Sequence, residues 1–210
     1  MQRAVLEESK ASLRRRLLAA RKSISSDQRR LWSGLIQASA LRFAPYLAAT
    51  DLALYSPIDS EVETQAILAH ALASKKAVYY PRIDPDNSAW FFQIGAETHV
   101  RPGRFGIDEP AGGLPLPVYA QDSREHTLIF VPGLGFDIGG HRLGRGGGAY
   151  DRMLTALKRQ AISVGLAFEL QILERLPTDE WDQKIHYVIT EKRIIDCGAS
   201  ASRNRDLIVS

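Results

Sequence analysis

Apolar residues recur along this chain with two different periods. Stretches in which they return about every 3.6 residues, as on one face of a helix, alternate with short apolar runs that are typical of buried strands. The helical pattern predicts helices over residues 4–22, 26–41, 63–74 and 149–159, the second capped by Ser26 or Asp27. The apolar runs predict strands over residues 50–56, 76–81, 89–94, 127–131, 161–168 and 187–190.

This alternation of strands and helices determines the expected fold. Strands joined through helices form parallel sheets whose two faces are covered by helices. The sequence therefore predicts a single α/β domain over residues 1–210, with three layers and a mostly parallel, Rossmann-like sheet. The amino-terminal helices, within residues 4–41, are expected to pack on that core, and the Gly- and Pro-rich residues 95–125 to be mostly loop.

Composition agrees with an ordinary globular protein, because 45% of the residues are apolar and 24% are charged. The apolar runs are shorter than the ~20 residues that span a bilayer, and no signal-peptide pattern is visible, so no membrane association is expected. The lone Cys197 fits a reducing compartment. We therefore expect a cytoplasmic protein that acts as a monomer.

Positive charge is concentrated at the amino end. Residues 1–30 hold nine Lys and Arg against three acidic residues, a net charge of +6, whereas the rest of the chain carries −3. Such a segment suits nucleic acid or a phosphorylated ligand, but it also suits the solvated face of a helix. A phosphate- or nucleic-acid-binding module is therefore one hypothesis, and its affinity would fall steeply with salt.

The strongest chemical signal is the segment FVPGLGFDIGGHRLGRGGGAYDRML, residues 130–154. Eight glycines fall between Gly133 and Gly148, and glycine lets backbone N–H groups approach a ligand closely. A helix is expected to start after Gly148, and helix amino-termini attract anions. Arg142 and Arg145 add full positive charge. Together these features predict a phosphate-binding site; a flexible surface loop is the structural alternative.

A dinucleotide-binding interpretation of the same segment is weaker. The segment has no Walker A pattern, but Gly144, Gly146 and Ala149 satisfy G-x-G-x-x-A, and Glu169 lies about one strand further on. That fingerprint should follow its strand directly, whereas about a dozen residues separate Val131 from Gly144. A dinucleotide-dependent oxidoreductase is thus the third hypothesis.

With four shorter segments, the glycine-rich segment resembles the 5-formyltetrahydrofolate cyclo-ligases, also called methenyltetrahydrofolate synthetases. The shorter segments stand in the expected order: KASLR at 10–14, SPIDSEVET at 56–64, FGIDEP at 105–110 and LPTDEWDQKIHYVIT at 176–190. The likeness covers roughly residues 10–191. The glycine-rich segment is quite specific, and the short segments gain weight from their order.

The resemblance implies an enzyme that converts 5-formyltetrahydrofolate and ATP, with Mg²⁺, to 5,10-methenyltetrahydrofolate, ADP and phosphate. Phosphoryl transfer to the formyl oxygen would turn that oxygen into a leaving group, and N10 would close the ring. Such transfer is catalysed mainly by positioning and charge stabilisation. The substrates are small molecules, so neither nucleic acid nor a membrane is an expected partner.

The resemblance also implies residue roles. Arg145 is the catalytic residue, which stabilises the moving phosphoryl charge. ATP binding falls to Lys10, Arg14, Gly144, Arg145, Gly146, Gly147, Gly148, Ala149, Tyr150 and Asp151. Folate binding falls to Ser56, Glu61 and Tyr150. Asp151 and Asp182 are the Mg²⁺ ligands, because oxygen donors suit that ion.

Some of these residues also have structural interpretations, and two depart from the family pattern. Lys10 and Arg14 suit a solvated helix face, Glu61 an exposed loop, and Asp151 the first turn of a helix. Ala149 stands where many members have an aromatic residue before the tyrosine, and Gly147 where some members carry lysine.

Overall fold

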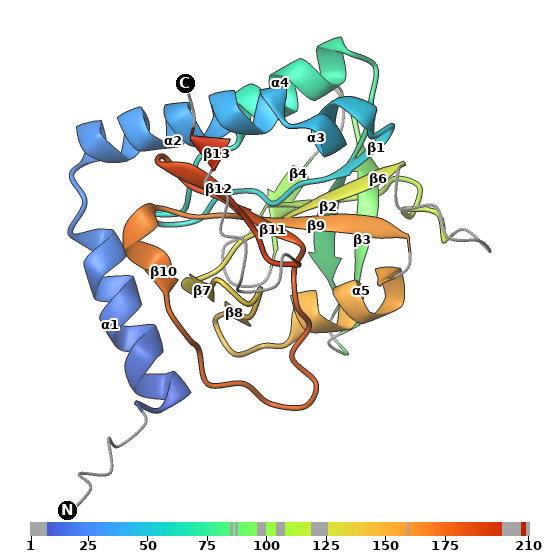
Figure 1. Ribbon diagram of the computed structural model, residues 1–210. Coiled ribbons are helices and arrows are strands. Elements are labelled where there is room, and N and C mark those ends of the chain that lie inside the picture. Colours follow the sequence, from blue (N-terminus) through green and yellow to red (C-terminus); the bar gives the residue numbers. More distant parts are fainter. Residues whose placement is uncertain are drawn as a thin grey trace, which may run out of the picture.

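The computed structural model describes residues 8–84, 86, 88–95, 100–103, 108–118, 126–158, 160–198 and 207–208. Over these residues the chain forms an α/β fold with one large sheet (Figure 1). The helices are α1 (Lys10–Lys22), α2 (Ser26–Arg42), α3 (Ala44–Ala48), α4 (Gln65–Ala73), α5 (Ala149–Leu157) and the 3-10 helix η2 (Glu169–Gln171). The large sheet contains β1 (Asp51–Ala53), β2 (Ala77–Ile83), β3 (Ala89–Ile94), β6 (Thr127–Val131), β9 (Ala161–Leu166), β11 (Tyr187–Ile189), β12 (Arg193–Asp196) and β13 (Leu207–Ile208).

The large sheet has the strand order β13-β12-β11-β9-β6-β1-β2-β3. The central strands from β11 to β2 are parallel, and the antiparallel strands β3, β12 and β13 lie toward its two sides. Two small sheets accompany it, one of β10 (Ile172–Leu173), β7 (Gly135–Asp137) and β8 (Arg142–Leu143), the other of β4 (Val100–Pro102) and β5 (Asp108–Pro110). The mostly parallel α/β fold expected from the sequence is confirmed.

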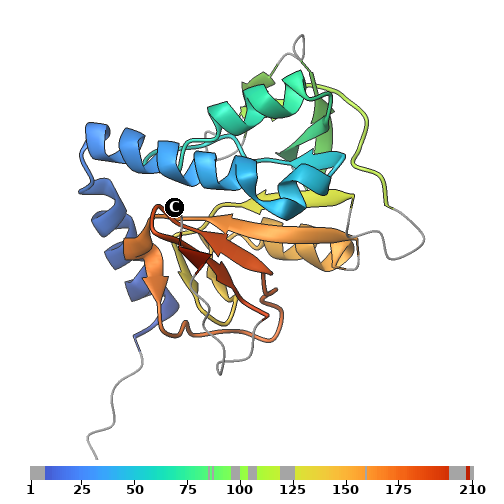
Figure 2. The same ribbon diagram turned by 45° about the horizontal axis from the view of Figure 1, so that its top comes forward.

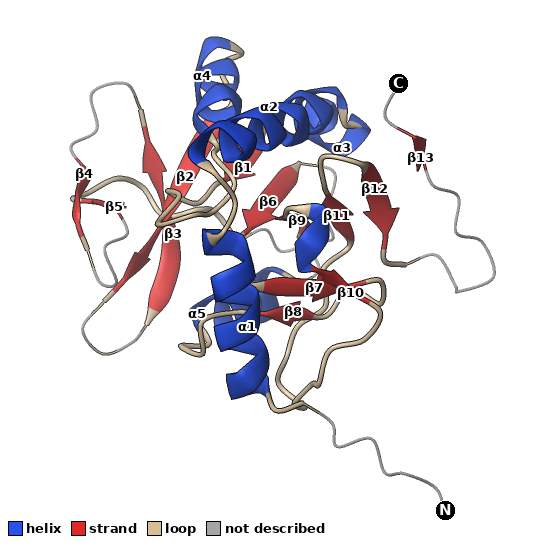
Figure 3. Cartoon of the chain, turned by 90° about the vertical axis from the view of Figure 1, so that its left-hand side faces the viewer, coloured by secondary structure: helices blue, strands red, loops and turns tan. Residues whose placement is uncertain are grey.

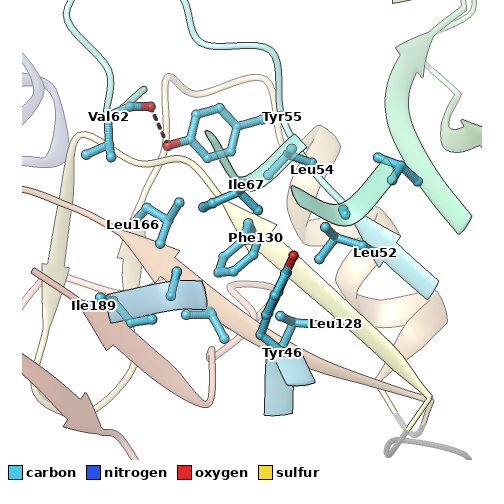
Figure 4. Close-up of a cluster of buried hydrophobic side chains, with 14 of the residues drawn as sticks. Tyr46, Leu52, Leu54, Tyr55, Val62, Ile67, Leu128, Phe130, Leu166 and Ile189 are labelled. Carbon is cyan, nitrogen blue, oxygen red and sulfur yellow. Dashed lines mark hydrogen bonds between the residues drawn. The ribbon is translucent and has the colours of Figure 1, made fainter. Parts of the chain in front are cut away.

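Helices cover both faces of the large sheet. α2, α3 and α4 lie on one face and α5 lies on the other (Figures 1 and 2). All five residues of β6 are buried, which is typical of a parallel strand between two helical layers. Phe130 joins the cluster beneath α2–α4, where Tyr46, Leu52 and Ile67 surround it (Figure 4), whereas Ile129 and Val131 join the cluster beneath α5.

The amino-terminal helix α1 lies beside the small sheet of β7, β8 and β10 (Figure 3). Leu13 and Leu17 of α1 pack with Leu134, Leu143 and Leu176 in a separate apolar cluster. This packing brings the basic helix against the glycine-rich segment that follows β6. Within the described residues, no helix has the length and apolar character needed to cross a bilayer.

Several expected elements differ in extent from those observed. α1 begins at Lys10, because the Ser9 side chain accepts a hydrogen bond from Ser12 N and caps the helix there; residues 4–7 of the expected helix lie outside the described residues. β1 ends at Ala53, well before residue 56. The strands expected over 89–94 and 127–131 are confirmed to the residue. The expected loop over 95–125 contains the short pair β4 and β5, and residues 105–107 of the FGIDEP segment lie outside the described residues.

Candidate active site

A cavity of about 700 Å³ lies where α1, the segment after β1 and the glycine-rich segment meet. Its walls combine cations, carboxylates, backbone and aromatic rings. Every residue to which the sequence assigned a role lines it: Lys10, Arg14, Ser56, Glu61, Gly144, Arg145, Gly146, Gly147, Gly148, Ala149, Tyr150, Asp151 and Asp182. The fold therefore brings together, at a single cavity, residues that are up to 172 positions apart.

The glycine-rich segment is ordered by its own secondary structure. Its first half forms β7 and β8, which pair with each other, and β7 also pairs with β10. Gly146 (φ 105°) and Gly148 (φ 67°) have left-handed backbone conformations that favour glycine. Gly148 is the N-cap of α5, so the first turn of that helix forms part of the cavity wall. Free N–H groups at a helix start suit a phosphate, and a flexible surface loop does not describe this segment.

Lys10 and Arg14, the two α1 cations that the sequence assigned to ATP, contact other elements, so they do not form a simple solvated face. Arg14 Nε donates to Gly144 O at 2.9 Å. Lys10 Nζ donates to Asp179 Oδ2 at 2.7 Å and to Asp182 Oδ2 at 2.5 Å. Partial burial lowers the pKa of Lys10, but these hydrogen bonds outweigh it and raise the pKa overall. Lys10 is therefore firmly charged at the cavity wall.

The two expected metal ligands, Asp151 and Asp182, each carry a cationic partner. Asp151 Oδ2 accepts from Arg142 Nη2 at 2.9 Å, and Asp182 accepts from Lys10. Burial opposes ionisation of Asp182, but the hydrogen bonds from Lys10 and from Asp179 N lower its pKa overall. Among the described residues, no group of three or more His, Cys, Asp or Glu is arranged around a metal position. Two carboxylates at one cavity nevertheless match the protein donors that Mg²⁺ takes beside phosphate and water.

Glu61 and Arg145 meet at the wall of the same cavity. Arg145 Nη2 lies 3.0 Å from Asp59 Oδ2 and 3.6 Å from Glu61 Oε1. Glu61 is only 8% exposed, so the exposed-loop interpretation of this carboxylate is wrong. Burial raises the pKa of Glu61, and the nearby Arg21 and Arg145 counteract part of that rise. The residue assigned to phosphoryl transfer thus touches the residue assigned to folate.

Arg21 does not line the cavity, but it lies buried next to Glu61, and the sequence interpretation did not single it out. Its side chain is 1% exposed, its Nε donates to Ser60 Oγ at 3.1 Å, and its Nη1 donates to Gly133 O at 3.1 Å. Its Nη2 lies 3.9 Å from Glu61 Oε1 and has no hydrogen-bond partner among the described residues. The sequence did contain a signal for the burial of Arg21. Arg21 follows Leu13 and Leu17 at four-residue spacing, so it lies on the same, apolar face of α1.

Tyr150 forms an inner wall of the cavity. Its ring packs edge-on against Phe91 with centroids 6.2 Å apart, and the Arg142 guanidinium lies 5.6 Å from the ring centroid. The Tyr150 hydroxyl is buried, has no hydrogen-bond partner among the described residues, and has a pKa raised by burial. Because residue 149 is alanine, positions 149 and 150 supply one aromatic ring, where the family pattern has two in many members. Arg142, expected to add charge for a phosphate, is instead engaged by Asp151.

Together, the fold and the site define an α/β protein with a glycine-rich, cationic cavity next to the ends of parallel strands. Comparison with known proteins identifies the family. The model of the 5-formyltetrahydrofolate cyclo-ligase family matches residues 6–191. The chain belongs to that family, and it is therefore an enzyme of the ligase class rather than an oxidoreductase.

Individual relatives agree with this assignment. The chain is 35% identical over 148 residues to the 5-formyltetrahydrofolate cyclo-ligase of Haemophilus influenzae, covering 68% of this chain and 76% of the relative. It is 29% identical to the Escherichia coli K12 cyclo-ligase, covering 83% and 96% of the two chains. The solved structure of 5,10-methenyltetrahydrofolate synthetase from Aquifex aeolicus superimposes with a TM-score of 0.77 at 30% identity, covering 93% of this chain and 96% of that chain.

Proposed function

We propose that this protein uses ATP and Mg²⁺ to convert 5-formyltetrahydrofolate into 5,10-methenyltetrahydrofolate, ADP and phosphate. The observation that carries the proposal is the single cavity lined by both expected sets of residues, those for ATP and those for folate. Its volume of about 700 Å³ lies within the range of about 300–1,000 Å³ that is usual for small-molecule sites.

The cavity divides into a phosphate side and a folate side. The ATP phosphates bind between Lys10 and Arg14 of α1 and the backbone of Gly144–Gly148, at the start of α5. The formyl-bearing ring binds toward Ser56, Glu61 and Tyr150. Lys10 has carboxylate partners and Arg14 a carbonyl partner, so phosphate binding extends an existing set of polar contacts.

The reaction proceeds in two displacements. The formyl oxygen attacks the γ-phosphorus, the bond from that phosphorus to the bridging oxygen of ADP breaks, and an iminium phosphate forms at N5. The lone pair of N10 then attacks the activated carbon, the carbon–oxygen bond breaks, and phosphate leaves with the electron pair. N10 loses its proton, which gives the methenyl cation. No protein nucleophile is needed at either step.

Arg145 acts where the two substrates meet. Its guanidinium reaches Glu61 on the folate side and belongs to the glycine-rich loop on the phosphate side. A positive charge there stabilises the phosphoryl oxygens while both the forming and breaking bonds are partial. Glu61 accepts hydrogen bonds from the pterin, and the nearby Arg21 offsets part of the rise in the pKa of Glu61 that burial causes.

Mg²⁺, when bound, supplies charge neutralisation to the phosphates. Asp151 and Asp182 are the residues that would hold it, directly or through water. Their partners, Arg142 and Lys10, hold both carboxylates in position at the cavity wall.

A mixing assay tests the proposal. Protein, 5-formyltetrahydrofolate, ATP and Mg²⁺ are combined, methenyl-folate is followed by absorbance, and ADP is measured in the same samples. We expect one ADP per methenyl product and no ADP release without folate. Folded protein that makes no methenyl-folate contradicts the proposal, as does an ATPase activity that folate leaves unchanged.

A further inference from the structure

Trp181 is a wall residue of the cavity to which the proposed mechanism gives no task. Its side chain is 69% exposed, although it lines the cavity. Large aromatic side chains are normally among the main contributors to buried apolar area. In the described part of the chain its ring takes part in no ring–ring contact. A wide apolar face is therefore presented to solvent at the edge of a polar site.

The backbone that carries Trp181 is held from both sides. Asp182 N donates to Asp179 O at 3.1 Å, and Asp179 N donates to Asp182 Oδ2 at 2.8 Å, which closes the turn. Just beyond, Gln183 Nε2 donates to Trp181 O at 3.1 Å, and Gln183 N lies 3.4 Å from Asp151 Oδ1. A fixed backbone lowers the entropy lost when a ligand orders the ring, so this exposed side chain is suited to binding.

The same turn belongs to the phosphate side of the cavity. Lys10 binds both Asp179 and Asp182, which lie two residues before and one residue after Trp181. Glu61, by contrast, lies near Arg145 and Arg21 and accepts a hydrogen bond from Ile58 N. The nucleoside of ATP extends away from its phosphates, and a purine base stacks well on an aromatic ring.

We propose that Trp181 is the stacking platform for the adenine base of ATP. This inference rests on the proposed function, because it takes the ligand at Lys10 to be a nucleoside triphosphate. It assigns the recognition of the base to a residue on the turn 179–182 and the recognition of the phosphates to α1 and the glycine-rich loop.

The test compares two ligands that share phosphates and differ in the base. Affinities of wild type, Trp181→Ala and Trp181→Phe for ATP and for inorganic tripolyphosphate are measured by calorimetry with Mg²⁺ present. Stacking losses on alanine substitution correspond to about 5- to 150-fold in affinity. We expect Trp181→Ala to weaken ATP binding within that range, to change tripolyphosphate binding less than about twofold, and Trp181→Phe to recover most of the loss.

Fluorescence gives a second readout. ATP should alter the tryptophan emission of wild type, and Trp181→Phe should abolish that change. Trp90→Phe is the matched control, because Trp90 lies on β3, donates to Leu116 O at 3.1 Å and does not line the cavity. The Trp90 variant should keep the ATP response.

The outcomes separate the inference from the proposed function. Equal losses of ATP and tripolyphosphate affinity in a folded Trp181→Ala protein would mean that the ring only supports the turn, and the inference fails. Unchanged ATP affinity with a raised KM for 5-formyltetrahydrofolate would place the ring on the folate side and also overturns it. If wild type binds ATP no more tightly than tripolyphosphate, the inference is refuted but the proposed function is not. Failure of wild type to form methenyl-folate from ATP refutes the proposed function.

Discussion

Replacing Arg21 by Met tests whether the buried guanidinium stabilises the charge of Glu61. Met is of similar length and fills irregular space, so the change removes charge and donors while leaving little cavity. Gly133 O keeps a second donor, Gln171 Nε2, at 2.9 Å. The loss therefore falls mainly on Ser60 Oγ and on Glu61.

The expected loss of stability depends on the partners that Glu61 keeps when Arg21 is replaced. Removing one partner of a buried ion pair costs about 3–5 kcal/mol, because a charge stays buried without compensation. Glu61 keeps Arg145 at 3.6 Å and the Ile58 N–H at 3.2 Å, and its distance to Arg21 is a long 3.9 Å. We therefore expect the free energy of unfolding to fall by about 2–3 kcal/mol, somewhat below that range.

Urea unfolding of wild type, Arg21→Met, Glu61→Gln and the double variant isolates the interaction. In the Glu61→Gln background no carboxylate remains at position 61, so Arg21→Met should cost about 1–2 kcal/mol less than in wild type. Equal costs in the two backgrounds would show that Arg21 stabilises only the packing between α1 and its neighbours, and would refute the electrostatic reasoning.

The pH dependence provides a second measure of the same interaction. Burial raises the pKa of Glu61 above 4.5, so the folded protein binds this proton more tightly than the unfolded chain does. The resulting stabilisation is fully present below the unfolded pKa and is lost as the pH rises through the folded pKa. Arg21→Met should raise the folded pKa further and extend this loss to higher pH, whereas Glu61→Gln should remove it.

Three further predictions concern catalysis. Arg145→Ala should lower kcat by about 10²–10³-fold and raise the KM for ATP less, whereas the exposed Arg30→Ala should behave as wild type; a folded Arg145 variant within a few-fold of wild type would remove this residue from the mechanism. Glu61→Gln should raise the KM for folate and leave directly measured ATP affinity unchanged, and the opposite pattern would mean that the two subsites are reversed. Asp182→Asn should raise the Mg²⁺ concentration for half-maximal rate and be partly rescued by excess Mg²⁺. Asp151→Asn should be harder to rescue because Asp151 also holds Arg142 at 2.9 Å, and three superimposable Mg²⁺ titrations would make both aspartates structural.

Local patterns were sufficient for the interior elements of the fold. β6 and β3 match their predicted residues, because a continuous apolar run has one stable location, between two covering layers. α2 starts at Ser26, where a helix was expected, but the predicted cap was wrong. The N-cap is Ser25 and not Ser26 or Asp27, because the Ser25 side chain accepts a hydrogen bond from Gln28 N. β12 and the pair β4–β5 were not predicted, since short antiparallel strands depend on partners that are distant in sequence. β1 is shorter than its apolar run for the same reason, since pairing with β2 and β6 ends at Ala53.

For the site, the sequence by itself determined which residue types are present and, through the resemblance, which of them gather at one cavity. Tertiary structure decided their partners: Lys10 with Asp179 and Asp182, Arg145 with Asp59 and Glu61, and Arg142 with Asp151. It also decided that Arg21 is buried and that Trp181 is exposed. The physical reason is that a motif specifies the local backbone and side-chain chemistry. Burial and charge pairing, in contrast, depend on elements that meet only after the sheet, α1 and the turn 179–182 have packed together.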